Sequence, residues 1–235
     1  MISVRHAVPR KDVLLGIVCA DSIRTDQYPA RFGDELTDLL TRRRSDLTPD
    51  EEARRAAARD ILRNGRYRPT GRGKPASEYL LRAAAADDIP FPRINAPVDV
   101  CNYLSLKHVI PISLWDVDLA ETENFVFRLG QAGEAFVFNE GGQTIDVEDL
   151  LVGCRVREDG VSSGEPIVNP VKDSFLTKTT PSTERIAACV YAPASNVSRE
   201  GLESICSEFA GLLAQCGSSV GTAHAVLSTD DSVAV

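Results

Sequence analysis

Hydrophobic residues recur at helical spacing near the middle of the chain and then change to strand spacing. Apolar side chains lie three or four residues apart over residues 98–107, which is typical of an amphipathic helix. The helix is expected to stop before Pro111, because proline lacks the amide hydrogen that a helix interior needs. Residues 112–118 then alternate apolar and polar side chains, which predicts a half-buried strand. We expect the helix and the strand to frame a common cleft.

The same spacing rules divide the rest of the chain into further helices and strands. Helices are predicted over residues 32–44, 49–63, 76–86 and 199–215. Strands are predicted over residues 13–20, 150–157 and 185–191, and a hairpin over residues 125–127 and 135–138. Turns are expected at residues 139–142 and 159–164, and irregular chain at residues 166–170. Strands interrupted by helices favour an α+β fold, with a mixed, largely antiparallel central sheet and helices packed around it.

Length and composition suit one large domain. The chain has 235 residues, of which 43% are hydrophobic and 26% are charged, as in ordinary globular proteins. We expect a single domain over residues 1–216. Residues 217–235 are mostly small or polar, so a flexible tail is predicted there.

The charge pattern leaves two interpretations open for one basic segment. A net charge of −8 argues against a protein that holds nucleic acid by broad phosphate neutralisation. Positive residues nevertheless cluster in the loop over residues 65–75, which is rich in glycine and proline. The candidates for RNA contact are Arg66, Arg68, Arg72 and Lys74. The segment is either a solvated basic surface, as charge runs usually are, or a surface that faces RNA.

Several kinds of site and location are not expected. Six cysteines are scattered without a C-x-x-C pair or a histidine at zinc-ligand spacing, so no metal site is predicted. The basic loop lacks the G-x-x-x-x-G-K-[ST] spacing of a phosphate-binding loop, and no cofactor is expected. The N-terminal residues carry charges and no long apolar run, which favours a cytoplasmic protein with reduced thiols.

A combination of motifs gives the chain a family resemblance. Residues 95–106 read Asn-x-Pro-Val-Asp-Val-x-Asn-Tyr-x-x-Leu and are followed by a proline and Trp-Asp-Val-Asp. Together with the segments GKPASEYLLRAAA, FRLGQAGEAF and TKTTPST, this pattern resembles the B3/B4 domain of the phenylalanyl-tRNA synthetase β subunit, which carries the editing site. The similarity is closer to stand-alone B3/B4 proteins and covers roughly residues 60–195. It implies the same α+β fold.

The resemblance also implies a pocket that hydrolyses a wrongly attached amino acid. In the synthetases, the matching helix and strand line a pocket where tyrosine is removed from tRNA. Asp99, Asn102 and Tyr103 match the motif, and Pro111 matches the proline of the turn. Ser113 stands in place of the histidine that is characteristic of the synthetase turn.

Two further positions depart from the synthetase pattern. Cys101 replaces a common threonine, and it is either a buried packing residue or a nucleophile. A later synthetase glutamate has no clear counterpart, because an ungapped match through residues 177–183 places Phe175 there. Asp99 is either an acid in the pocket or a residue that stabilises the helix N-terminus.

Ester hydrolysis needs a positioned water, a group that orients or deprotonates it, and donors for the oxyanion. The candidate catalytic residues are Ser113, Asn102 and Asp99. The candidate substrate-binding residues are Cys101, Tyr103, Pro111, Thr179 and Thr180. Ser113, Asn102 and the two threonines can orient water and donate hydrogen bonds, but none of them is a strong base.

Three functions are consistent with these residues. The leading hypothesis is a free-standing editing-type hydrolase that cleaves an aminoacyl ester, above all on tRNA in trans. The second is a hydrolase for a small metabolite derived from an amino acid, and the third is a non-catalytic module that binds RNA or a partner protein. Neither a membrane nor DNA is an expected partner. The ATP-binding domain of a complete ligase has no room in 235 residues.

Overall fold

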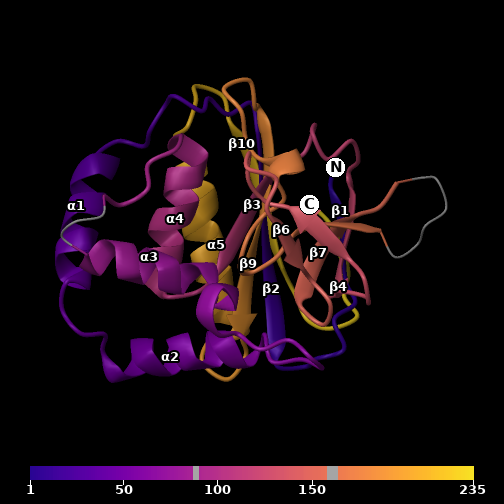
Figure 1. Cartoon of the computed structure of the whole chain (residues 1–235). Helices are drawn as coiled ribbons and strands as arrows, with labels where there is room; N and C mark the ends of the chain where they lie inside the picture. The colour runs from indigo at the N-terminus through magenta and orange to yellow at the C-terminus, as the bar shows by residue number, and fades with distance from the viewer. Residues whose placement is uncertain (87–89, 158–163) are drawn as a thin grey trace.

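A four-stranded antiparallel sheet stands between a layer of helices and a second sheet (Figure 1). The computed structural model describes residues 1–86, 90–157 and 164–235. The central sheet has the strand order β10 (Gly221–Leu227), β2 (Val13–Asp21), β9 (Arg185–Pro193), β3 (Ile112–Asp116). The second sheet has the order β11 (Ser232–Ala234), β1 (Ser3–His6), β4 (Asn124–Leu129), β7 (Leu151–Arg155), β8 (Glu165–Val168). A separate antiparallel pair is formed by β5 (Ala135–Val137) and β6 (Thr144–Asp146).

The helices gather on the side of the central sheet that faces away from β1, β4 and β7 (Figure 1). The α-helices are α1 (Phe32–Arg43), α2 (Pro49–Asp60), α3 (Ala76–Ala85), α4 (Ala96–His108) and α5 (Arg199–Leu213). Two short 3-10 helices are η1 (Gly71–Gly73) and η2 (Phe175–Thr177). Between the named strands, every pairing is antiparallel except that of β1 with β4. The predicted α+β fold, with a mixed and largely antiparallel arrangement of strands, is confirmed; the parallel pair lies in the second sheet, and the central sheet is antiparallel throughout.

Strand β2 is apolar on both faces because two hydrophobic cores meet across it. Leu14 and Val18 point into the core beneath the helices, whereas Leu15 and Ile17 point into the core between the sheets. Alternate residues of a strand point to opposite faces, so a strand covered on both sides needs a continuous apolar run. That requirement explains the uninterrupted apolar segment seen in the sequence.

Helix α4 is fixed at both ends by polar contacts. The Asn95 side chain accepts a hydrogen bond from the Val98 amide at 3.2 Å, which caps the N-terminus. At the C-terminus, the Arg43 guanidinium donates to the carbonyls of Leu106 and Lys107, at 3.2 and 2.7 Å. A cation near the carbonyl end of a helix also interacts favourably with the helix dipole. The helix ends before Pro111, as predicted.

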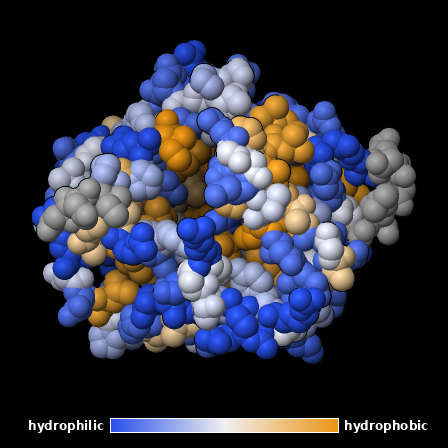
Figure 2. All heavy atoms as spheres, in the orientation of Figure 1, coloured by the Kyte–Doolittle hydropathy of each residue, from blue (hydrophilic) through white to orange (hydrophobic). Residues whose placement is uncertain are grey.

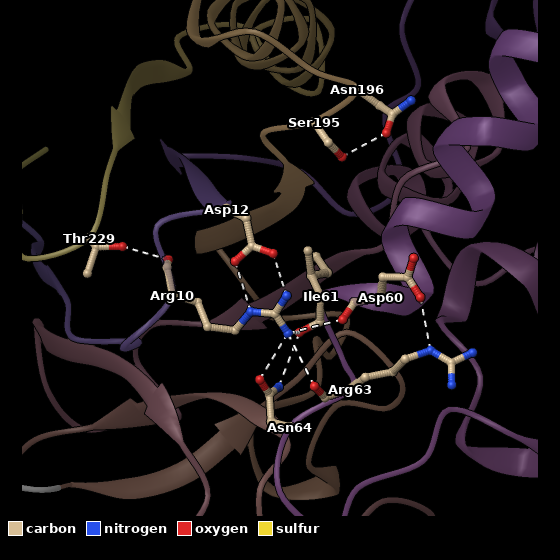
Figure 3. A network of polar contacts seen from close by, with 9 residues as sticks. All are labelled: Arg10, Asp12, Asp60, Ile61, Arg63, Asn64, Ser195, Asn196 and Thr229. Atoms are coloured by element: carbon tan, nitrogen blue, oxygen red, sulfur yellow. Dashed lines mark hydrogen bonds and ion pairs between the residues drawn. The ribbon is translucent and has the colours of Figure 1, made fainter.

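A second guanidinium ties helix α2 to the N-terminal segment (Figure 3). Nη1 of Arg10 donates to the carbonyls of Asp60 and Ile61, at 3.0 and 3.3 Å, and to Oδ1 of Asn64 at 3.0 Å. The Asp12 carboxylate orients this guanidinium by accepting from Nε at 2.9 Å. These contacts satisfy the open carbonyls at the helix end. They also fix the point from which the basic loop over residues 65–75 departs.

The last nineteen residues are not the flexible tail that composition suggested. Strand β10 pairs with β2 over seven residue pairs, and β11 pairs with β1 over three. Both strands lie at sheet edges, and Val226 and Leu227 are buried. Edge strands are held mainly by backbone hydrogen bonds, so small and polar side chains do not exclude them. The C-terminal residues are therefore part of the two sheets.

Other local predictions need correction. Residues 125–127 and 135–138 do not form a hairpin, because β4 pairs with β1 and β7 whereas β5 pairs with β6. The segment expected to be irregular contains most of β8, which pairs with β7. The turn predicted over residues 159–164 lies outside the described residues except for Gly164.

Within the described ranges, no helix has both the length and the apolar character needed to cross a membrane.

Candidate functional site

A cavity of about 340 Å³ lies between α4 and β3. Figure 2 shows a hollow over the space between these two elements, with hydrophobic residues at its edge. Val98 and Cys101 of α4 and Ile112 and Leu114 of β3 supply apolar wall. The polar lining residues are Asn102, Asn169, Lys172, Asp173, Lys178 and Thr179. Mostly apolar walls with a few convergent polar groups are typical of small-ligand sites.

The walls follow from the periodicity of the two elements. Positions 98, 101 and 102 fall on one side of a helix, because its residues repeat every three to four positions. Positions 112 and 114 fall on one face of a strand, because strand residues alternate between faces. The helix and strand predicted to frame a common cleft therefore do so.

Asp173 places a carboxylate in the lining of this cavity. Its Oδ2 accepts a hydrogen bond from the Leu114 amide at 3.3 Å. Its Oδ1 is shielded from solvent and has no hydrogen-bond partner among the described residues, although the residue as a whole is only half-buried. Burial raises the pKa of Asp173 to about 7, and hydrogen bonds from backbone amides and the charge of Lys178 oppose the rise. A carboxylate with this pKa can take up a proton near neutral pH.

Asn169 presents an unused donor in the same cavity. Its Oδ1 accepts from the amides of Val171 and Lys172, both at 2.8 Å, which fixes the side chain. Its Nδ2 is buried and has no partner within the described ranges. Asn169 and Asp173 thus both line the cavity, and each has one buried polar atom without a partner in the described structure.

Sequence reasoning missed Asp173 and Asn169. Both lie in the connection between β8 and η2, where an aspartate or asparagine is an ordinary loop residue. The raised pKa of Asp173 comes from its burial in the folded protein, which the sequence does not show, and the hydrogen bond from the Leu114 amide opposes the rise. The available signal was the proximity of Asp173 to Phe175, the position matched to the synthetase glutamate.

Ser113 does not lie in the cleft, contrary to expectation. Its neighbours Ile112 and Leu114 face the cavity, so strand alternation turns Ser113 to the other face of β3. There it is buried, and its Oγ lies 2.7 Å from the Tyr191 hydroxyl in a hydrogen bond. The hydrogen bond to Tyr191 accounts for a serine at this buried position.

Asp99 and Tyr103 also lie away from the cavity. Asp99 is 1% exposed and accepts hydrogen bonds from the Tyr28 hydroxyl, the Arg93 guanidinium and the Ile94 amide, at 2.9, 2.6 and 2.7 Å. This arrangement supports the interpretation that Asp99 stabilises the start of α4. The Tyr103 ring packs edge-on against Phe32 of α1 with centroids 5.6 Å apart.

The remaining substrate-binding candidates divide between cavity and surroundings. Cys101 lines the cavity, but burial raises the pKa of its thiol, so the nucleophilic thiolate is disfavoured. Thr179 lines the cavity, and its Oγ1 accepts from Asn95 at 2.9 Å. Thr180 is instead engaged in a local turn with Ser182 and Thr183. The Pro111 carbonyl accepts from the Tyr191 amide at 3.1 Å.

The four basic candidates for RNA contact have different environments. Arg66 pairs with Glu148 at 3.0 Å, and Arg68 donates to the carbonyls of Gly65 and Tyr67. Arg72 and Lys74 line an open groove of about 870 Å³ beside α3.

This groove carries positive charges that do not pair with the acidic residues lining it. Arg82 of α3 also lines the groove. Within the described ranges, neither it nor Arg72 nor Lys74 makes an ion pair. Two acids of the groove, Glu52 and Glu78, are paired with arginines of α2, whereas Asp46 adds a further negative charge.

No cluster of three or more His, Cys, Asp or Glu residues suited to a metal ion occurs in the described part of the chain.

Comparison with known proteins assigns the chain to a family. The sequence profile of the B3/4 domain family matches residues 70–203, which is more than half of the chain. The β subunit of phenylalanine–tRNA ligase from Geobacter sulfurreducens is 34% identical over 95 residues, which are 39% of this chain and 12% of the ligase subunit. The chain thus matches only a small part of the length of this relative. The matched residues include α3, α4, β3 and the loop that carries Asp173. This protein belongs to the B3/4 domain family.

Proposed function

We propose that this protein is an editing-type hydrolase that cleaves the ester bond of an aminoacyl-tRNA. The observation that carries the proposal is the Asp173 carboxylate, which belongs to the lining of a cavity of about 340 Å³ and has a pKa raised to about 7. A water molecule held by this carboxylate would lie beside any aminoacyl group bound in the cavity. The relative named as a phenylalanine–tRNA ligase subunit supports tRNA as the carrier of that group.

The cavity supplies the parts that ester hydrolysis requires. Asp173 accepts a proton from water, and the resulting hydroxide attacks the ester carbonyl carbon. The Asn102 amide, in the cavity lining, is the candidate donor to the developing oxyanion. When the carbon–oxygen bond to the ribose breaks, protonated Asp173 returns its proton to the ribose oxygen. The products are a free amino acid and a tRNA with an intact terminal hydroxyl.

The size and walls of the cavity favour an aminoacyl group with an apolar side chain. Val98, Ile112 and Leu114 provide apolar contact, and the volume lies at the lower end of the range for small-ligand sites. Cys101 lies in the same wall as a buried, protonated thiol. It therefore contributes shape to the cavity and is not needed as a nucleophile.

The test is deacylation of a panel of correctly and incorrectly charged tRNAs. Wild-type protein should release the amino acid from at least one of them. Asp173→Asn removes the base and keeps the shape, so the rate should fall by at least about 100-fold. Asn102→Ala should lower the rate by about 10-fold or more through loss of a donor. Thr180→Ala is the matched control, because Thr180 lies outside the cavity, and its rate should match wild type.

The outcomes separate the three functions. Loss of turnover in folded Asp173→Asn protein, with normal turnover in the control, supports the proposal. Hydrolysis of simple aminoacyl esters without hydrolysis of any charged tRNA would instead indicate a small-metabolite hydrolase, which the net charge of −8 favours. Binding of charged tRNA without any turnover would indicate a binding module.

A further inference from the structure

The mouth of the cavity carries large apolar side chains that are exposed to solvent. Phe175 and Leu176 of η2 are 44% and 51% exposed, and Ile94 is 64% exposed. Ile94 lines the cavity itself. In the sequence, the two η2 residues lie between Asp173 and Lys178, and both Asp173 and Lys178 line the cavity. An exposed aromatic ring beside a cavity is a candidate contact surface for a ligand that extends out of that cavity.

Two lysine side chains lie near the same mouth. The Lys178 ammonium lies 5.9 Å from the centroid of the Phe175 ring and donates to the Phe138 carbonyl at 2.8 Å. The Lys172 ammonium lies 3.8 Å from the centroid of the Phe138 ring. Burial lowers the pKa of Lys172, and the nearby charge of Arg72 lowers it further. Neither lysine forms an ion pair within the described ranges, and Asp173, on which the charge of Lys178 acts, is the one acid among the described lining residues, so the two lysines outnumber it.

From these contacts we propose that the mouth binds the terminal nucleotide of the substrate. Its base stacks on the Phe175 ring, and its phosphate lies near Lys178 and Lys172. Every nucleobase has a π-face that can stack on an aromatic ring, and cations beside the ring neutralise the attached phosphate. The mouth combines both features, whereas an apolar peptide would use only the ring. The inference rests on the proposed function, because the aminoacyl group enters the cavity while its nucleotide remains at the mouth.

The experiment compares two esters of the same amino acid, one on the ribose of adenosine 5′-monophosphate and one on ethanol. Phe175→Ala should raise KM for the nucleotide ester by about 5- to 150-fold, the range expected for loss of one base–aromatic stack. The same variant should leave hydrolysis of the ethyl ester unchanged. Phe175→Tyr should restore KM, because it restores the ring. Leu176→Ala is the matched control, since Leu176 is equally exposed but cannot stack.

The proposal is overturned if Phe175→Ala leaves KM for the nucleotide ester unchanged, or changes both esters equally. It is also overturned if Leu176→Ala has the same effect as Phe175→Ala, since a surface for an apolar protein partner would respond in that way. Lys178→Ala should raise KM for the nucleotide ester more than KM for the ethyl ester, and it should weaken the dependence of the nucleotide-ester KM on salt.

A binding measurement keeps this inference separate from the proposed hydrolysis. Trp115 is the single tryptophan of the chain and is fully buried, so it gives a constant fluorescence background. In the Phe175→Trp variant, adenosine 5′-monophosphate should quench the added indole saturably, and the additional Lys178→Ala substitution should weaken this binding. Absence of saturable quenching overturns the inference even if esters are hydrolysed. Saturable quenching supports it even if no ester is hydrolysed.

Discussion

At the scale of single residues, the carboxylate of Asp173 shows how surroundings determine chemistry. One of its oxygens is bonded to the Leu114 amide and the other is buried without a partner in the described structure. The charged form is therefore poorly solvated, and the pKa rises to about 7. The raised pKa suits Asp173 to act as a base near neutral pH. The burial of its charged form that raises the pKa also lowers the stability of the folded protein.

This cost gives a prediction about pH and stability. The folded state holds the Asp173 proton more tightly than the unfolded chain does, so stability falls as pH rises between the unfolded value near 4 and the folded value of about 7. Asp173→Asn should therefore stabilise the protein at pH 8 by on the order of 2 kcal/mol, and by clearly less at pH 5. Urea unfolding at the two pH values measures the difference. An equal effect at both would contradict a raised pKa.

The rate of catalysis should depend on the same carboxylate, but it should rise with pH where stability falls. Because the deprotonated carboxylate is the base, kcat/KM for ester hydrolysis should rise with pH up to about 7 and then level off. The Asp173→Asn variant should lack this rise. Loss of activity together with a gain in stability is an effect that a merely structural residue would not produce.

At the same scale, the sequence identified candidate polar and reactive residues, but it did not show in which direction each side chain points. Cys101 and Asn102 lie in the cavity wall because the helical period places them there. Ser113 was expected beside them, yet a one-residue step along a strand reverses the face. Asp173 was not predicted at all, because its burial depends on packing between β3 and a loop about sixty positions later.

At the scale of elements, the reliable predictions were those with strong local signals. Helix α2 was predicted over residues 49–63 and begins with a capping box of Thr48 and Glu51, and β2 matches the strand predicted over residues 13–20. Pairing between strands was harder to predict. The segment around β5 is a short apolar run that suits several partners, and only the complete sheets show that it pairs with β6. Strands β10 and β11 lacked any strong apolar signal and were missed.

The contact between α5 and β2 gives a prediction at this scale. Gly16 of β2 lies directly beneath α5, and a methyl group added there would overlap Cys206 Sγ and press on Leu202. Gly16→Ala should therefore destabilise the protein by about 1–3 kcal/mol, the usual cost of overpacking a core. Chemical denaturation gives the free energy of unfolding.

A second glycine provides the control for that substitution. Gly211 lies in α5, where an added methyl group meets no atom within 4 Å. Gly211→Ala should stabilise the protein by up to about 1 kcal/mol, because alanine has the higher helix propensity. If the two substitutions had the same sign, close packing of α5 on Gly16 would not be the cause of the first effect.

At the scale of the whole molecule, charge is distributed unevenly. The net charge is −8, yet Arg72, Lys74 and Arg82 lie together in one groove without ion pairs in the described structure. Helix α3 connects this groove with the cavity, because its first residue, Ala76, lines the cavity while Arg82 lines the groove. An extended anionic substrate that occupies both places would be held by local positive charge against an otherwise repulsive surface.

This arrangement predicts how salt affects the reaction with tRNA. Each phosphate neutralised by a lysine or arginine releases counterions, so affinity falls with the logarithm of salt concentration. Lys74→Ala and Arg82→Ala should each reduce the salt slope of kcat/KM for aminoacyl-tRNA by about one. Neither should alter hydrolysis of a small ester. Arg66→Ala is the control, because Arg66 is already paired with Glu148 and should leave the slope unchanged. Equal effects of all three substitutions would show that tRNA responds only to overall charge, and the groove would then have no specific part in binding.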